Sequence, residues 1–130
     1  MLFRSKAGDK DYGRLSVTGR LYGETAFLFD VSPKCFLPPP GVVSRVIRYN
    51  FKVSVRAKHE AFLLEIIRIA FSQRRKTLLS LLFQALKPKR NRQELEKVFE
   101  ELGFPLKTRG EALSLEQFIR LSDMLDARRP

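Results

Sequence analysis

The spacing of hydrophobic residues changes near residue 56 of the chain. Before that point, residues 25–31 and 42–51 are rich in aromatic and β-branched side chains, which is typical of β-strands. After it, apolar residues recur about every 3.6 positions, the period of a helix with one buried face. The sequence therefore predicts an α+β protein with a sheet portion followed by a helical portion.

The sheet portion is small. Residues 15–22, followed by Gly23, predict a short helix before the first strand. The loop 33–40 joins the two strands, and its prolines fix the backbone toward an extended path. One helix and two strands cannot cover both faces of a sheet, and an isolated hairpin is at best marginally stable in water. We therefore expect residues 1–54 to be the C-terminal remnant of a larger α/β domain.

The helical portion, residues 55–130, predicts a small all-α domain of about four helices. Two of them begin with capping boxes, Asn91 with Glu94 and Ser114 with Gln117, in which side chains satisfy free backbone N–H groups. The predicted inward-facing residues are Phe62, Leu63, Ile66, Ile67 and Ala70; Leu78, Leu82, Ala85 and Leu86; Leu95, Val98, Phe99 and Leu102; and Leu115, Phe118, Ile119 and Leu125.

Length and composition exclude several classes of protein. The chain has 130 residues, of which 44% are hydrophobic, enough for a packed core. No apolar run approaches the ~18 residues needed to cross a bilayer, and residues 1–4 are followed at once by charged ones. We therefore expect a soluble, cytoplasmic protein without membrane contact. With one cysteine, Cys35, and one histidine, His59, neither an internal disulfide nor a metal site is expected.

The net charge of +11 is concentrated in the middle of the chain. Residues 51–92 hold 11 Lys and Arg against 2 Asp and Glu, whereas residues 1–50 hold 8 against 4 and residues 93–130 hold 6 against 8. A surface this basic attracts polyanions and releases counterions from a phosphate backbone. The charge therefore indicates one basic face, which either binds nucleic acid or only keeps the protein in solution.

Three segments carry a specific resemblance to a known family. They are Y-G-R-L-S-V at 12–17, V-S-P-K-C-F-L-P-P-P-G-V-V-S at 31–44 and F-S-Q-R-R-K-T-L at 71–78. All three resemble motifs of the small-subunit ribosomal RNA adenine dimethyltransferases. R-G-E-A-L-S at 109–114 is a weaker similarity, because that family usually has alanine in place of Gly110. We expect this difference to be small, since the following helix begins only at Ser114.

The resemblance implies an architecture and a function. Residues 1–54 would be the end of a Rossmann-like methyltransferase domain, and residues 55–130 a helical RNA-binding domain. The family transfers methyl groups from S-adenosylmethionine to N6 of adenines in small-subunit ribosomal RNA during ribosome biogenesis. The implied partner is the immature small ribosomal subunit, and a separate N-terminal half is a further candidate partner.

The methyl donor needs a glycine-rich turn after a strand and an acidic residue for its ribose. The seven glycines include no G-x-G, and neither Asn-Pro-Pro-Tyr nor Asn-Leu-Pro-Tyr occurs. We therefore expect no S-adenosylmethionine site in this chain and no methyl transfer by the chain alone. We therefore expect the chain to be a truncated gene product, a separate domain or half of a split enzyme.

Phe36 is the candidate residue for gripping the target base. An enzyme that methylates an adenine amino group must hold the base out of its stack, and an aromatic ring against the base supplies that grip. The resemblance implies this role for Phe36, which precedes three prolines that fix its backbone. The alternative is that Phe36 is a core anchor beneath the loop.

Arg74, Arg75 and Lys76 are the candidate RNA-binding residues, expected at the head of a helix. Cations there oppose the helix dipole unless an anion meets them, and arginine forms bidentate contacts with phosphate. The alternatives are a solvated helix start or ion pairs with Glu60 and Glu65. The same basic surface is expected to include Arg68, Lys87, Lys89, Arg90 and Arg92.

Two other classes of function remain open. One is a stand-alone RNA-binding or ribosome-assembly module without catalysis. The other is a DNA-binding helical domain, but no predicted helix has the features of a recognition helix and Phe36 has no obvious role there.

Overall fold

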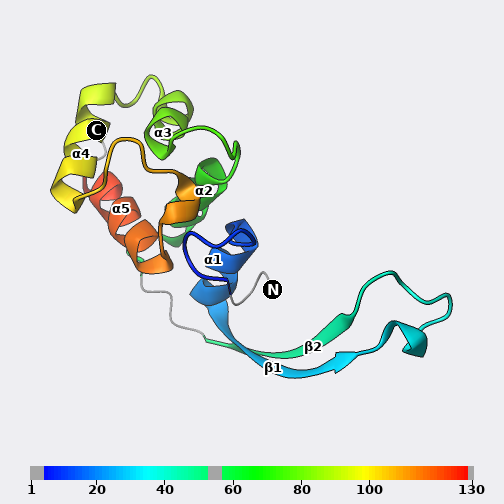
Figure 1. The fold of residues 1–130 in the computed structure, drawn as a ribbon. Coiled ribbons are helices and arrows are strands. Elements are labelled where there is room, and N and C mark those ends of the chain that lie inside the picture. The colour runs from blue at the N-terminus through cyan, green and yellow to red at the C-terminus, as the bar shows by residue number, and fades with distance from the viewer. Residues whose placement is uncertain (1–4, 53–56, 129–130) are drawn as a thin grey trace.

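The computed structural model describes residues 5–52 and 57–128. In chain order its elements are α1 (Arg14–Tyr22), β1 (Gly23–Val31), η2 (Pro33–Cys35), β2 (Ser44–Phe51), α2 (Glu60–Ala70), α3 (Leu78–Leu86), α4 (Arg92–Leu102), η3 (Gly110–Ala112) and α5 (Leu115–Ala127). The α-helices gather into one helical body, and the β1–β2 hairpin projects from it (Figure 1). The predicted α+β class, with a helix and two strands followed by four helices, is confirmed within these residues.

The helix ends follow the predicted local chemistry. At the start of α4, the Asn91 side chain accepts a hydrogen bond from the Glu94 N–H at 2.8 Å, and the Glu94 carboxylate accepts one from the Asn91 N–H at 3.4 Å. Ser114 and Gln117 form the same reciprocal pair at the start of α5. α4 ends at Gly103, whose φ of 74° is left-handed and therefore favours glycine. Both predicted capping boxes are confirmed.

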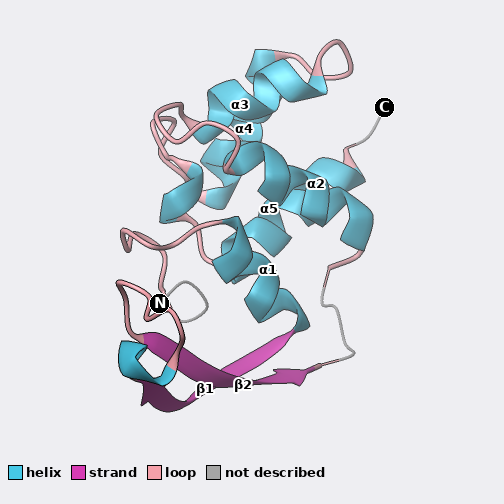
Figure 2. Cartoon of the chain, turned by 90° about the vertical axis from the view of Figure 1, so that its right-hand side faces the viewer, coloured by secondary structure: helices cyan, strands magenta, loops and turns pink. Residues whose placement is uncertain are grey.

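One hydrophobic core joins helices that lie on either side of the hairpin in the sequence. Val17 and Leu21 of α1 are buried in the same cluster as residues of α2, α3, α4 and α5. α1 contacts α2 and α5 and lies between the hairpin and the other helices (Figure 2). The predicted boundary between residues 54 and 55 lies outside the described residues. The core shows, however, that the helix before the hairpin packs with those after it.

The predicted inward faces are confirmed for α2, α4 and α5, but not for all of α3. Ala85 is exposed and Leu86 is only half-buried, whereas Leu79 and Leu81 are buried. α3 has the sequence L-L-S-L-L-F-Q-A-L, which is apolar nearly all around the helix. Its period therefore does not determine which face packs against the core.

The hairpin is antiparallel, and its strands pair from Gly23 opposite Phe51 to Val31 opposite Ser44. The register shifts between Phe27 and Phe29, as at a β-bulge. The first strand begins two residues earlier than predicted. Val42 and Val43, expected in the second strand, lie in the loop before β2.

The base of the hairpin is tied to α1. The Tyr49 hydroxyl donates a hydrogen bond to the Gly19 carbonyl, and the Lys52 N–H donates one to the Tyr22 carbonyl at 2.7 Å. Because these bonds join the hairpin to a helix of the core, the hairpin leaves the helical body in a defined direction.

Candidate nucleic-acid interface

Arg74, Arg75 and Lys76 lie in the turn between α2 and α3. Thr77 is the N-cap of α3, and its side chain accepts a hydrogen bond from the Ser80 N–H at 3.3 Å. The three cations therefore precede the helix, whereas the sequence placed them at its head. All three are exposed, so the turn presents a compact positive surface close to the positive end of the α3 dipole.

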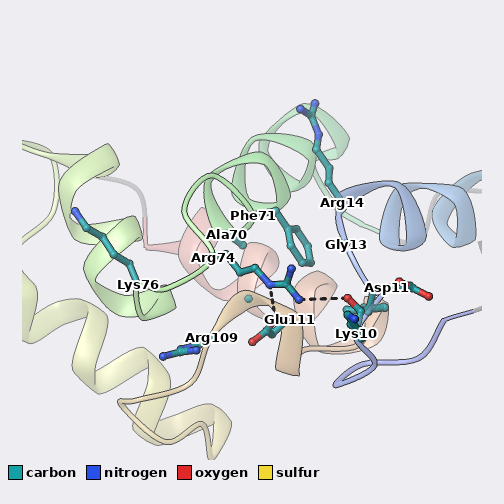
Figure 3. Close-up of a pocket in the computed structure, with 12 residues that line it drawn as sticks. Lys10, Asp11, Gly13, Arg14, Ala70, Phe71, Arg74, Lys76, Arg109 and Glu111 are labelled. Carbon is teal, nitrogen blue, oxygen red and sulfur yellow. Dashed lines mark hydrogen bonds and ion pairs between the residues drawn. The ribbon is translucent and has the colours of Figure 1, made fainter. Parts of the chain in front are cut away.

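A pocket of about 390 Å³ lies beside this turn (Figure 3). Its lining comes from segments 10–14, 70–76 and 109–111, which are far apart in the sequence. The cationic lining residues are Lys10, Arg14, Arg74, Lys76 and Arg109, and the acidic ones are Asp11 and Glu111. With five cations and two carboxylates, the lining carries an excess of three positive charges. An anion entering the pocket is therefore favoured electrostatically.

Arg74 connects the three segments. Its Nε lies 3.8 Å from a Glu111 carboxylate oxygen, and an Nη atom donates a hydrogen bond to the Lys10 carbonyl at 3.3 Å (Figure 3). The Arg74 side chain is nevertheless 71% exposed. A guanidinium has five N–H donors, so one hydrogen bond leaves capacity for a bidentate contact with phosphate.

The ion pairs predicted as an alternative for the basic turn are not those in the structure. Glu65 pairs with Arg68 at 2.5 Å, and Glu60 accepts a hydrogen bond from the Tyr22 hydroxyl. The hydrogen bond from Arg68 lowers the pKa of Glu65. Arg74 instead pairs with a carboxylate that lies 37 positions later in the sequence.

Gly110 allows η3 to pack closely on the end of α2. A Cβ at this position would lie 2.5 Å from the Ala70 carbonyl oxygen, which is too close for any other residue without a backbone shift. The expectation that Gly110 is a small change from alanine is therefore wrong. The glycine sets how near Arg109 and Glu111 come to the Arg74 turn, and so shapes the pocket.

Tyr12 fixes the N-terminal wall of the pocket. Its hydroxyl donates a hydrogen bond to the Leu113 carbonyl at 2.6 Å, and its ring meets the Phe71 ring edge-on at 6.0 Å. Burial raises the pKa of Tyr12 to about 12, so the hydroxyl remains a donor across the physiological range. The loop before α1 is thereby held against the start of α5.

The other predicted RNA-binding cations do not line the pocket. Arg68 is engaged with Glu65. Lys87 lies over the Phe83 ring, with its ammonium 4.2 Å from the ring centre, and Lys89 is exposed. These three side chains are at the surface, but they do not join the three-segment cluster around Arg74.

Arg90 differs from the rest of the predicted set because it is buried, with 6% of its surface exposed. Its guanidinium donates a hydrogen bond to the Leu125 carbonyl, near the end of α5. Arg90 therefore ties the α3–α4 connection to α5 and is not presented at the surface, contrary to the prediction. Arg92, the next cation, pairs with Glu96 along α4 at 2.9 Å.

Phe36 directly follows η2 in the connection between β1 and β2, and this connection forms the far end of the projecting hairpin (Figure 1). Its N–H donates a hydrogen bond to the Pro33 carbonyl at 3.2 Å, which closes η2. The ring is 44% exposed and is not part of the hydrophobic core. The core-anchor interpretation is therefore wrong, and the structure places Phe36 and the Arg74 turn in separate regions.

The sequence alone did not identify Lys10, Arg14 or Arg109 as neighbours of Arg74. A signal was present, however, because segments 12–17, 71–78 and 109–114 all belong to the resemblance. The structure brings parts of these three segments together around one pocket. The remaining segment of the resemblance, 31–44, forms the hairpin tip instead.

The comparison with known families decides the identity. Residues 3–127 match the family model described as ribosomal RNA adenine dimethylase. The chain belongs to the ribosomal RNA adenine dimethylase family. This membership covers both the hairpin and the helical body, and the family resemblance drawn from the four segments is confirmed.

Curated relatives of this chain are longer than the chain itself. It is 40% identical over 125 residues to "Ribosomal RNA small subunit methyltransferase A" of Lachnoclostridium phytofermentans, and 44% identical over 119 residues to the protein of that name from Clostridium perfringens. The matches cover 95% and 90% of this chain, but 43% and 41% of the relatives. The chain thus spans about two fifths of the length of these relatives.

Solved structures agree on the fold. A dimethyladenosine transferase from Plasmodium falciparum superposes with a TM-score of 0.73 at 23% identity, covering 90% of this chain and 50% of that one. The 23S rRNA methyltransferase ErmE superposes with a TM-score of 0.61 at 22% identity, covering 95% of this chain and 50% of that one. The hairpin and helical body of this chain therefore correspond to half of these structures.

Among the described residues, no helix is long and apolar enough to cross a membrane, and no group of three or more His, Cys, Asp or Glu side chains is arranged to hold a metal ion.

Proposed function

We propose that this chain is the RNA-binding C-terminal part of an S-adenosylmethionine-dependent adenine N6,N6-dimethyltransferase. In this proposal, the complete enzyme acts on small-subunit ribosomal RNA during ribosome biogenesis in the cytoplasm. The observation that carries the proposal is the convergence of three motif segments around one cationic pocket. Family membership and the names of the relatives support the substrate class.

The family uses S-adenosylmethionine, but residues 5–52 and 57–128 do not fit a site for it. Their sheet consists of two antiparallel strands, and no glycine-rich turn leads from a strand into a helix. The described glycines with left-handed φ are Gly8 and Gly103, neither of which follows a strand. In the proposal these residues bind RNA and transfer no methyl groups by themselves.

The two regions have different roles in the proposed enzyme. Phe36, exposed at the hairpin tip, stacks on the target adenine once a donor-binding half is present. Arg74, Arg75 and Lys76 hold phosphates of the RNA at the helical body. Arg68, Lys87 and Lys89 add to the positive field around them without lining the pocket.

RNA binding by the Arg74 turn is tested by the salt dependence of affinity for small-subunit ribosomal RNA. A variant with Arg74→Gln, Arg75→Gln and Lys76→Gln is compared with the wild-type chain by fluorescence anisotropy at several salt concentrations. Because ~0.7–0.9 counterions are released per phosphate contact, we expect the slope of log K against log salt to fall by about two to three. Affinity should fall at least tenfold at low salt.

The matched control removes three exposed cations elsewhere on the helical body, Lys58→Gln, Lys97→Gln and Arg120→Gln. It has the same net charge as the test variant, so it measures the effect of total charge alone. Equal losses in the two variants would show that the Arg74 turn has no special role. A wild-type chain without salt-sensitive RNA affinity would contradict the proposed function as a whole.

The role of Phe36 is tested in a protein extended by a complete donor-binding half. Phe36→Tyr keeps an aromatic face and should retain most methyl transfer to immature small subunits, whereas Phe36→Ala should lose at least tenfold. Equal methylation by the two variants would remove the stacking role. Both variants keep the cations of the Arg74 turn, so the salt dependence of their RNA affinity should match that of wild type.

A second candidate function is a stand-alone RNA-binding or ribosome-assembly module. The observation that favours it is the poor fit of the described residues to a methyl-donor site. Comparing this chain with the extended protein in the methyl-transfer assay separates the two candidates. If the extended protein is also inactive while the RNA affinity remains, the stand-alone module is the better description.

A further inference from the structure

The pocket beside the Arg74 turn has an aromatic wall as well as a cationic lining. Phe71 follows the last residue of α2 and is only half-buried, although its ring packs against Tyr12 at 6.0 Å and Phe118 at 5.9 Å between ring centres. These two contacts fix the ring in place. Figure 3 shows the Phe71 ring next to the Arg74 guanidinium, on the side of Gly13.

The guanidinium of Arg74 is held in position before any ligand arrives. Glu111 and the Lys10 carbonyl contact it from two different segments, and it remains largely exposed. A cation positioned in this way loses less conformational entropy on binding an anion than a freely moving side chain. The buried hydrogen bond from Tyr12 to Leu113 and the close packing at Gly110 fix the segments that carry these contacts.

The volume of about 390 Å³ limits what the pocket can accept. It falls in the range of ~300–1,000 Å³ that is usual for sites of small ligands. A base with its sugar and phosphate suits such a space, whereas the stacked bases of a duplex are held away from it by the backbone. An aromatic wall beside an arginine matches the two parts of a nucleotide, because every base has a face for stacking and every phosphate accepts paired hydrogen bonds.

We propose that this pocket holds one unstacked nucleotide of a single-stranded RNA segment, with its base against Phe71 and its phosphate on Arg74 and Arg109. The proposal rests on the proposed function and deepens it by naming a second nucleotide site, separate from the hairpin tip that carries Phe36. RNA is then held at two places, one on the hairpin and one on the helical body.

The experiment uses the full chain and two labelled probes of equal length and charge, a heptaadenylate RNA and a ribose-phosphate heptamer without bases. Fluorescence anisotropy should show about tenfold tighter binding of the heptaadenylate by the wild-type chain, because only that probe can stack. Phe71→Leu should abolish this preference and leave the affinity for the baseless probe within about twofold.

Arg74 and Arg75 provide a matched pair in the same turn, since Arg74 lines the pocket and Arg75 does not. We expect Arg74→Gln to weaken the binding of both probes about tenfold, and Arg75→Gln to weaken it less than threefold. Arg109→Gln should resemble Arg74→Gln. Equal effects of Arg74→Gln and Arg75→Gln would overturn the pocket proposal while leaving RNA binding by the basic turn intact.

Because Phe71 packs against the core, a measurement on the wild-type chain accompanies the variants. In proton NMR spectra, the ring signals of Phe71 and Tyr12 should shift on addition of heptaadenylate and stay in place with the baseless probe. Ring signals that respond equally to both probes, or to neither, would overturn base stacking in the pocket. If the wild-type chain bound neither probe, the proposed function itself would fail.

Discussion

The helical body and the β1–β2 hairpin bury their hydrophobic residues to very different extents. The buried hydrophobic residues of the described chain are Tyr12 and residues of α1 to α5 and of the loops between the later helices, and none lies between residues 24 and 52. In the hairpin, Phe29 is 55% exposed and Phe51 is 81% exposed. The helical body therefore has a core of its own, whereas the hairpin keeps its shape through strand pairing and its anchorage to α1.

The difference follows from how helices and a two-stranded sheet can bury apolar surface. A two-stranded sheet has two faces and two edges without partners, and its hydrophobic side chains gain little from burial within the sheet. Helices with an apolar stripe bury that stripe by packing on one another. If stability comes from the helical body alone, comparable substitutions should cost much more there than in the hairpin.

The largest expected effect is on the free energy of unfolding, when one phenylalanine in each region is replaced by alanine. Phe99→Ala removes a fully buried ring from the helical body and should lower the free energy of unfolding by about 3–5 kcal/mol. Phe29→Ala in the hairpin should change it by less than about 1 kcal/mol, because that ring is mostly in water. Urea denaturation followed by circular dichroism measures both. Similar losses would mean that the hairpin contributes to a shared core.

The next largest effect on stability is expected when one glycine in each region is replaced by alanine. Gly110→Ala places a Cβ against the Ala70 carbonyl and should cost about 1–3 kcal/mol of unfolding free energy. Gly41→Ala in the hairpin loop meets nothing within 4 Å and should stay within about 0.5 kcal/mol of wild type. Thermal unfolding by calorimetry gives both values. A neutral Gly110→Ala variant would show that η3 can move away from α2 at no cost.

A smaller difference between the hairpin and the helical body is expected in how a surface lysine changes self-association. The exposed hydrophobic residues and free strand edges of the hairpin favour contact between chains. Phe29→Lys should weaken self-association about fivefold, or ~1 kcal/mol, by removing a half-exposed ring. Leu106→Lys, at a position of similar exposure in the helical body, should have little effect. Sedimentation velocity provides the measurement, and a monomeric wild-type chain would contradict the prediction.

The smallest expected effect is the titration of a cross-strand ion pair. Arg45 donates a hydrogen bond to Asp30 at 2.7 Å, which lowers the pKa of that carboxyl group. Any stability gained from the pair is present above the ordinary pKa of aspartate and is lost as the pH falls through the lowered value. NMR titration of Arg45→Gln should return the pKa of Asp30 toward its ordinary value. The pKa of Glu101, lowered by its hydrogen bond from Arg128 in the helical body, should not change.

Features that depend on neighbours in the sequence could be predicted well. The capping boxes of α4 and α5, the glycine that ends α4 and the two strands all follow from local residue types. These features are determined within a few residues, so one sequence is enough to place them.

Features that depend on packing between distant segments could not be predicted. Arg90 is like the surface cations around it in the sequence, but the end of α5 covers it and supplies a carbonyl acceptor. In the sequence, Gly110 can be related only to the helix that follows it, whereas its constraint comes from Ala70. The pocket likewise forms only where three distant segments meet, and the spacing of hydrophobic residues within each segment does not reveal such contacts.

The hairpin leaves the helical body between two helices, α1 and α2, that both remain in the core. A protease that cut the exposed tip once, near Leu37, would divide the chain into two pieces. The N-terminal piece would keep α1, which packs on the helices of the other piece, and the hydrogen bond from Tyr12 to Leu113 would still bridge the two. The nicked protein would therefore stay assembled as a noncovalent complex, and cleavage at the tip would break the link between β1 and β2 without releasing either piece.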